Sequence, residues 1–353
     1  MFNGISFYYL EPYAPYYQEE KMKKLLSMML ILVLALSLVA CGGKKEEEEG
    51  KKTMKLAIIY TALGDFWDIC GSGGKKRVEE LKTEYPDWNV ALECTASSEQ
   101  GVAAQIRVLE NIISLGYDGM CVAASDAEGL TPTLNAAVDA GMFVITMDTD
   151  CPDSKRACFV GTHNENFGRK LAQFAVDWEK DNGGAKIIVM HGAVAQLGMI
   201  QRLKGITDVV AENAATGAEL LDYQSPPSAD AGQSTEEAMM LANPTWNSAL
   251  CTHAGGAWVS AVFEENGWND AATNKAHCGV LSDDTAQVIN AVKDGFATVT
   301  QVQKQANWAY NGVDIMFKKI ALGQDPSSDF IETPTFYVTI DNVYDDDMYP
   351  ERQ

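Results

Sequence analysis

Two adjacent aromatic residues, Phe66 and Trp67, are the first side chains whose type and position point to ligand chemistry. They follow a short apolar run, residues 56–60, whose lack of polar alternation is typical of a strand buried on both faces of a parallel sheet. Gly64 and Asp65 break that run before a helical segment begins. Ligands of open α/β sheets bind beyond the carboxyl ends of the strands, where this pair lies. One aromatic could fasten the helix to the sheet. Both are less able to do so together, because neighbouring helical residues point about 100° apart.

Composition and charge describe an acidic globular protein. The chain has 353 residues, is 46% hydrophobic and carries a formal charge of −22 at pH 7. This length allows one large domain or two lobes with an ample core. A chain this acidic repels nucleic acid, so we expect no nucleic-acid partner.

Motifs that would bind a nucleotide, a dinucleotide or zinc, or that carry a nucleophilic serine, are missing from the sequence. Residues 71–74 are glycine-rich, but they lie within a helical segment and lack the spacing of a phosphate-binding loop. Seven cysteines follow residue 41, without a CxxC pair or zinc-ligand spacing. Cys151 and Cys158 flank a short loop and could form a disulfide, which spacing alone does not decide. We therefore expect neither a cofactor nor a metal ion.

Residues 22–40 have the organisation of a bacterial export signal. A basic start at Met22 precedes an apolar run that is too short for a comfortable membrane span. The run ends in Leu-Val-Ala-Cys-Gly, which resembles the lipobox of bacterial lipoproteins and implies that Cys41 is lipidated and becomes the first residue after cleavage. The alternative is an ordinary signal peptide or membrane anchor with a chance cysteine.

The flanking segments fit this interpretation. Residues 1–21 match no part of a signal peptide and are predicted to be an over-long start. Residues 41–53 form a charged tether. We expect a protein outside the cytoplasm, held at the cell membrane by its lipid.

From residue 55 onward, apolar strand-like runs alternate with amphipathic helical stretches, which predicts βαβ units and parallel sheets. The first set of predicted strands is 56–60, 89–94, 119–123 and 142–147. The second set is 157–160, 186–190, 219–223, 249–252, 279–281 and 298–302, and a last helix at 307–322 and a last strand at 336–340 close the chain. Two sets of this size predict two doubly wound α/β lobes.

Six segments, in order, resemble the sugar-binding class of periplasmic binding proteins, the ribose- and galactose-binding group. They read IIYTALGDFW, GYDGMCVAASDAEGLTPTLNAAVDAGMFVITMDTD, FVGTHNENFGRKLAQ, QRLKGI, ALCTHAGGAWVSA and INAVKDGFATVTQVQ. The resemblance implies a type 1 fold whose chain crosses a hinge three times, near residues 148–150, 303–305 and 331–334. The implied N-terminal lobe is 54–149 with 304–332, and the C-terminal lobe is 150–303 with 333–345.

The same resemblance implies ligand-binding roles for individual residues. Phe66 and Trp67 match an aromatic pair that sandwiches a sugar ring, whose C–H face suits an aromatic surface. Asp126 and Asp283 match carboxylates that accept hydrogen bonds from sugar hydroxyls, and charge strengthens such bonds. Each could instead cap the helix that follows it. Gln303 matches a hinge-side amide that can donate and accept.

Other positions depart from the family pattern. Ile200 stands where the family often has an arginine, while Arg202 matches a structural arginine. Thr252 and His253 replace a common Asn-Asp pair; a single histidine is usually structural, but this one falls on a ligand-side turn. Asp65 and Asp148 complete the expected binding set.

These features predict a monomeric, extracytoplasmic, lipid-anchored receptor that captures a small sugar by hinge closure and delivers it to an ABC-transporter permease, without enzymatic activity. One alternative is a sugar-sensing lipoprotein that feeds a signalling partner. The other is a surface glycosidase that uses Asp126 and Asp283 as its two carboxylates.

Overall fold

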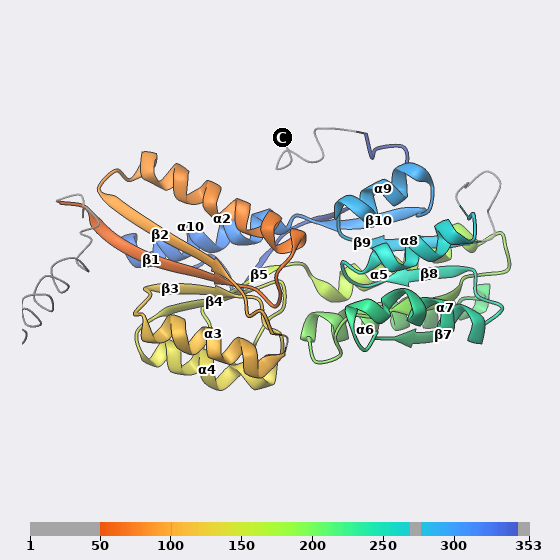
Figure 1. The fold of residues 1–353 in the computed structure, drawn as a ribbon, viewed down its shortest axis with the longest axis horizontal. Coiled ribbons are helices and arrows are strands. Elements are labelled where there is room, and N and C mark those ends of the chain that lie inside the picture. The colour runs from red at the N-terminus through yellow and green to blue at the C-terminus, as the bar shows by residue number, and fades with distance from the viewer. Residues whose placement is uncertain (1–49, 100, 269–276, 345–353) are drawn as a thin grey trace, which may run out of the picture. The chain divides into compact units, whose positions relative to one another are not determined.

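The computed structural model describes residues 50–99, 101–268 and 277–344. The predicted export signal, Cys41 and most of the tether therefore lie outside the described residues. Within them the chain forms two α/β lobes, each built on a six-stranded sheet (Figure 1). The predicted fold class of two lobes with mainly parallel sheets is confirmed. No helix in the described ranges has the length and apolar character needed to cross a membrane.

The sheet of the first lobe is parallel throughout, in the order β11-β5-β4-β3-β1-β2. Its strands are β1 (Lys52–Ile59), β2 (Trp88–Thr95), β3 (Gly119–Val122), β4 (Phe143–Met147), β5 (Phe159–Gly161) and β11 (Phe330–Glu332). Its helices are α2 (Asp65–Glu84), α3 (Val102–Ser114), α4 (Ala127–Asp139) and α10 (Gln305–Leu322). In Figure 1, α2 and α10 lie on one side of this sheet and α3 and α4 on the other.

Strand β1 has apolar residues on both faces because helices cover both faces of its sheet. Leu56 and Ile58 pack in the cluster that includes α2 and α10, whereas Ala57 and Ile59 pack against α3 and α4. Helices α2 and α10 approach closely at Gly73, where an added Cβ would lie 1.9 Å from the backbone oxygen of Ala306. The glycine-rich stretch therefore serves helix packing and not phosphate binding.

The sheet of the second lobe has the order β12-β10-β9-β8-β6-β7, and β12 alone among these strands is antiparallel. Its strands are β6 (Lys186–Met190), β7 (Glu219–Gln224), β8 (Ser248–Cys251), β9 (Cys278–Ser282), β10 (Val299–Gln303) and β12 (Thr335–Val338). Its helices are α5 (Asn164–Glu179), α6 (Leu197–Glu212), η1 (Ala214–Thr216), η2 (Ala229–Ala231), α7 (Gly232–Ala242), α8 (Gly256–Glu265) and α9 (Ala286–Asp294). Helices α5 and α6 pack on one face, and α7, α8 and α9 on the other.

The first passage between the lobes differs from the expectation at residues 148–150. Strand β5 pairs with β4 and with β11, so the first sheet extends to Gly161 and the chain leaves it at residues 162–163. The stacked rings of Phe159 and Phe330, 5.3 Å apart, fix this edge. The other two passages lie at Lys304, between β10 and α10, and at residues 333–334, between β11 and β12.

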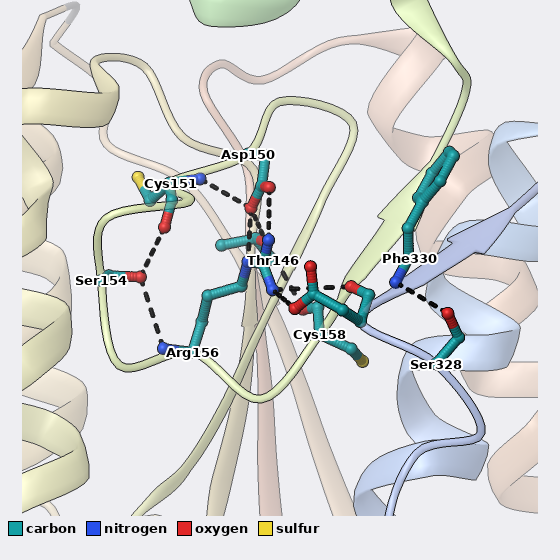
Figure 2. A network of polar contacts seen from close by, with 9 residues as sticks. Thr146, Asp150, Cys151, Ser154, Arg156, Cys158, Ser328 and Phe330 are labelled. Atoms are coloured by element: carbon teal, nitrogen blue, oxygen red, sulfur yellow. Dashed lines mark hydrogen bonds and ion pairs between the residues drawn. The ribbon is translucent and has the colours of Figure 1, made fainter.

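An ion-pair network holds the loop between β4 and β5 (Figure 2). Asp150 accepts hydrogen bonds from the Thr146 hydroxyl at 2.5 Å and from the backbone N–H of Cys151 at 2.7 Å. The buried Arg156 guanidinium donates to both oxygens of Asp150, at 2.7 and 2.6 Å, and also pairs with Asp329 just before β11. This bidentate arrangement fixes the loop immediately after residues 148–149.

All seven cysteines in the described part of the chain are free thiols. Cys151 and Cys158 are among them, so the disulfide left open by the sequence is not formed. Burial raises the pKa of Cys151 to about 12 and that of Cys158 to about 11. Both thiols therefore stay protonated and act as small buried apolar groups.

Glu236 on α7 gives the second lobe a pH-dependent stability. Its side chain is fully buried, neither carboxylate oxygen has a hydrogen-bond partner, and burial raises its pKa to about 8. As pH rises from the unfolded-state pKa towards 8, the unfolded chain ionises while the folded one keeps its proton. We expect the free energy of unfolding to fall across this window and the Glu236→Gln variant to show a smaller fall, because it loses the contribution of this carboxyl group.

Urea unfolding at about pH 5 and about pH 8 measures this difference. Glu237→Gln, on the same helix but exposed, is the matched control and should retain the wild-type pH dependence. Equal slopes in wild type and Glu236→Gln would contradict the assignment.

Candidate functional site

A cavity of about 670 Å³ lies at the carboxyl ends of strands from both sheets. Residues that follow β1, β3, β4, β6, β8 and β9 line it, as the general rule for open α/β sheets predicts. The structure brings together at this cavity most of the residues expected from the sequence, namely Phe66, Trp67, Asp126, Asp148, His253, Asp283 and Gln303.

Asp65 and Thr252 do not line the cavity, contrary to expectation. Asp65 is the exposed first residue of α2. Thr252 is fully buried, and its hydroxyl accepts a hydrogen bond from the backbone N–H of Gly192 at 3.1 Å. Thr252 thus joins the ends of β6 and β8 behind the cavity. A residue at the end of a strand can either link two strands or face a ligand, and the sequence alone does not distinguish these roles.

The aromatic pair forms a corner and does not sandwich a ligand. The rings of Phe66 and Trp67 meet edge-to-face, 5.0 Å between centroids at 89°. Trp67, only 7% exposed, stacks on Tyr60 at 5.0 Å and 24°. A sugar ring cannot enter between two rings in contact, so the predicted placement between them is wrong. A ligand can lie only against the corner they form.

Asp126 caps a helix and also lines the cavity, so the capping role does not rule out the predicted ligand contact. It is the N-cap of α4, with Oδ1 accepting from the backbone N–H of Gly129 at 2.7 Å, and it also lines the cavity. The adjacent Ser125 lines the cavity too, and its backbone N–H donates to the side chain of Gln105 at 2.9 Å. Gln105 donates in turn to the backbone oxygens at the ends of β1 and β3. This buried amide fixes the first-lobe side of the site.

Asp148 and Asp283 occupy corresponding places in the two lobes. Each directly follows the strand that stands third in its sheet, β4 or β9. Each also has a left-handed backbone, with φ of 59° and 69°, and no other non-glycine residue in the described ranges has positive φ. Such a conformation costs energy outside glycine and is common at ligand sites, where the surroundings hold it.

Arg202 on α6 organises the second-lobe side of the site. It is 1% exposed, and its Nε, Nη1 and Nη2 atoms donate to Asn164 Oδ1 at 2.8 Å, to the Thr252 backbone oxygen at 2.6 Å and to Gln303 Oε1 at 2.7 Å. Its guanidinium also lies over the ring of Phe167, 4.1 Å from the centroid. Gln303 links Arg202 to Asp283, because its Nε2 donates to Asp283 Oδ1 at 2.7 Å.

The carboxyl groups of Asp148 and Asp283 hold their protons more tightly than those of ordinary aspartates. Burial raises the pKa of Asp283 to about 7 and that of Asp148 to about 6, while the Arg202 charge opposes the shift in both. Asp283 does not cap α9, since Thr285 is the N-cap and accepts from the backbone N–H of Val288 at 3.4 Å. The capping alternative for Asp283 is therefore wrong.

His253 contributes a neutral ring to the cavity. Burial, with the nearby Arg202 charge, lowers its pKa to about 4. Its Nδ1 lies 3.1 Å from the buried Cys251 sulfur, and the ring packs edge-on against Trp258 at 5.6 Å. Within the described ranges, no three or more His, Cys, Asp or Glu side chains form a group that could hold a metal ion.

The sequence analysis missed several residues that line the cavity. Arg202 was interpreted as structural only, although it also reaches the cavity wall. Ser125, Gln196 and Met199 were not singled out. Ser125 could have been found from its place beside Asp126, whereas Gln196 and Met199 start a helix without any distinctive spacing.

A family model described as a periplasmic binding protein domain matches residues 56–325. The chain belongs to the periplasmic binding protein family. It is 26% identical over 299 residues to a D-ribose/D-allose-binding protein of Pseudomonas aeruginosa, covering 81% of this chain and 88% of that protein. The resemblance to the sugar-binding class is thereby confirmed.

Solved structures of the family show the same fold. An ABC-transporter solute-binding protein from Burkholderia graminis, in complex with D-arabinose, gives a TM-score of 0.75 at 22% identity and covers 84% of this chain and 98% of its own. GanP, a glucose-galactose binding protein from Geobacillus stearothermophilus, gives 0.73 at 19% identity, covering 83% and 100%. The relatives of this family member are transport-associated binding proteins and not enzymes, so the glycosidase alternative is set aside. Family membership also implies a location outside the cytoplasm.

Proposed function

We propose that this periplasmic binding protein captures a small sugar in the cavity between its two sheets and delivers it to an ABC-transporter permease. The lobes close on the ligand by bending at the three passages of the chain. The closed form docks on the permease, and a lipid on Cys41 keeps the receptor at the membrane.

The observation that carries the proposal is the pairing of Asp148 and Asp283 around Arg202. Each lobe contributes one carboxyl group on a strained backbone, and both face one cavity that an aromatic corner also lines. Carboxylates accept hydrogen bonds from sugar hydroxyls, and aromatic rings suit the C–H face of a sugar. The relatives named for ribose, allose, glucose and galactose, and the one solved in complex with D-arabinose, support this ligand class.

Closure has a physical basis in the hinge. Gln303 lies at the end of β10, directly before Lys304 and the passage to α10, and it bonds both Arg202 and Asp283. Gln305 then bonds Asp284 at 2.8 Å across that passage. A sugar bound to carboxyl groups of both lobes adds contacts that only the closed form completes, which shifts the open–closed equilibrium.

A thermal-shift screen of the full chain against neutral pentoses and hexoses tests the proposal, because a ligand at a hundredfold its Kd adds about 2.7 kcal/mol of stability. Calorimetry then gives the affinity of each hit, and small-angle scattering with that sugar should show compaction. Failure of every sugar to raise the melting temperature would reject sugar capture. Binding without compaction would reject closure alone.

The lipid anchor gives a separate prediction. We expect translation to begin at Met22 and the cell-bound protein to start at a lipidated Cys41. Mass spectrometry of protein extracted from membranes should show a lipid-modified N-terminal cysteine. The Cys41→Ala variant should retain residues 22–40 and lack lipid. A mature wild-type chain with an unmodified Cys41 would show that the lipobox assignment is wrong.

A further inference from the structure

Charges in the cavity wall are unbalanced. Three carboxyl groups line it, those of Asp126, Asp148 and Asp283, against the single guanidinium of Arg202. His253, the other titratable side chain in the wall, is neutral because its pKa is lowered to about 4. The lining therefore has a negative surplus.

Arg202 is largely engaged by the protein itself. Each of its three nitrogens donates one hydrogen bond to a group of the protein, and Phe167 lies against one face of the guanidinium. The side chain is 1% exposed. An anionic ligand would thus meet three carboxyl groups and, among the described lining residues, one cation that is already largely engaged.

The three carboxyl groups, in contrast, each keep one oxygen for a ligand. Asp126 uses Oδ1 for the Gly129 N–H, Asp283 uses Oδ1 for Gln303, and Asp148 uses Oδ2 for the Thr149 hydroxyl at 3.3 Å. No described residue hydrogen-bonds the second oxygen of any of the three. All three residues line the cavity, and none of these second oxygens is among the fully buried polar atoms that lack a hydrogen-bond partner.

We propose that the site is selective for ligand charge: it rejects sugars that carry a carboxylate or phosphate and binds an amino sugar, with its protonated amine, more tightly than the neutral parent sugar. This inference rests on the proposed function and narrows its ligand class. A sugar hydroxyl already makes a charge-assisted hydrogen bond to a carboxylate, and an ammonium group in the same place adds the attraction between two opposite full charges.

The raised pKa values of Asp148 and Asp283 support the same selectivity. Burial disfavours their charged forms, and the Arg202 charge offsets this only in part. A ligand cation would supply the missing positive charge and favour ionisation of both groups. A ligand anion would oppose ionisation of both.

Calorimetry with the full chain at about pH 7, where an amine remains largely protonated, tests the inference. The probes are D-glucosamine, D-galactosamine and D-mannosamine, each compared with its neutral parent, its N-acetyl derivative and, for glucose and galactose, the uronic acid. In the best-binding series we expect the amine to bind at least about tenfold tighter than the parent. The N-acetyl form, which has the bulk without the charge, should lose that gain, and the uronic acids should not bind.

Two isosteric variants separate charge from shape. In Asp283→Asn and Asp148→Asn, the ratio of amine to parent affinity should fall towards one, because the carboxylate charge is removed while the side-chain size is kept. Asp230→Asn, an exposed residue of η2 outside the cavity, removes one charge elsewhere and should leave the ratio unchanged.

The outcomes distinguish this inference from the function on which it rests. A parent sugar that binds as tightly as its amine in every binding series, or any uronic acid that binds, overturns the charge selectivity and leaves sugar capture intact. An unchanged ratio in both Asn variants also overturns it. Failure of every probe to bind, together with failure of the neutral panel, removes sugar capture and this inference with it.

Discussion

Replacing Arg202 with alanine should lower the free energy of unfolding by about 3–5 kcal/mol and also abolish measurable sugar binding. The variant leaves Gln303 Oε1, Asn164 Oδ1 and the Thr252 backbone oxygen without their donor in a buried place. A buried acceptor that loses its partner pays the cost of desolvation without compensation. The loss of one side chain therefore affects α5, β8 and β10 at once.

Binding should fail for an electrostatic reason as well. Arg202 is the charge that lowers the pKa values of Asp148 and Asp283 against the effect of burial. Without it both carboxyl groups take up protons more readily, so at neutral pH they present fewer charged acceptors to sugar hydroxyls. Any residual affinity of Arg202→Ala should rise with pH as these groups ionise.

Urea unfolding and calorimetry measure the two effects separately. Arg169→Ala is the matched control, since Arg169 lies on the facing helix α5 and pairs only with the surface acids Glu212 and Asp208. Its stability and affinity should stay close to wild type, because exposed ion pairs contribute little. Wild-type stability in Arg202→Ala would show that the hydrogen-bond network around this residue is not rigid.

The strand and helix order was predictable because each buried strand is a short apolar run between amphipathic helices. Strand β6, KIIVM, is an example, since helices cover both faces of its sheet and leave no polar alternation. The sheet membership of β5 was not predictable. Its three residues carry no periodic signal, and its partner β11 lies far along the sequence. The predicted lobe boundary failed at that point.

The site was predictable in its residue types and less so in its geometry. Asp148 and Asp283 directly follow strands, Gln303 ends one, and Asp126 lies in the loop after β3, so topology alone brings them to one edge. The orientation of Trp67 depends on its stacking with Tyr60, and the central position of Arg202 depends on three contacts distant in sequence. Such tertiary contacts leave no local pattern.

Asp283→Ala should weaken binding of the cognate sugar by about tenfold to a hundredfold while the fold stays intact. The cognate sugar here is the one that raises the melting temperature most in the panel. Asp283 is 2% exposed, and its Oδ2 atom is left for a ligand hydroxyl once Oδ1 has accepted from Gln303. Alanine removes that acceptor and leaves the sugar hydroxyl without a hydrogen-bond partner in the closed cavity. Gln303 Nε2 loses its acceptor in this variant, but removal of the unfavourably buried carboxyl group offsets that loss, so we expect little change in stability.

Thr285→Ala provides the comparison that separates binding from helix capping. Thr285, two residues along, is the N-cap of α9, and its loss should cost about 1 kcal/mol of stability without changing affinity. The two variants thus predict opposite results: Asp283→Ala reduces affinity and spares stability, whereas Thr285→Ala reduces stability and spares affinity. Calorimetry with the cognate sugar gives the affinity of each variant, and urea unfolding gives its stability. Wild-type affinity in Asp283→Ala would mean that the second lobe holds the sugar through other groups, and His253, whose ring also lines the cavity, would be the first to replace.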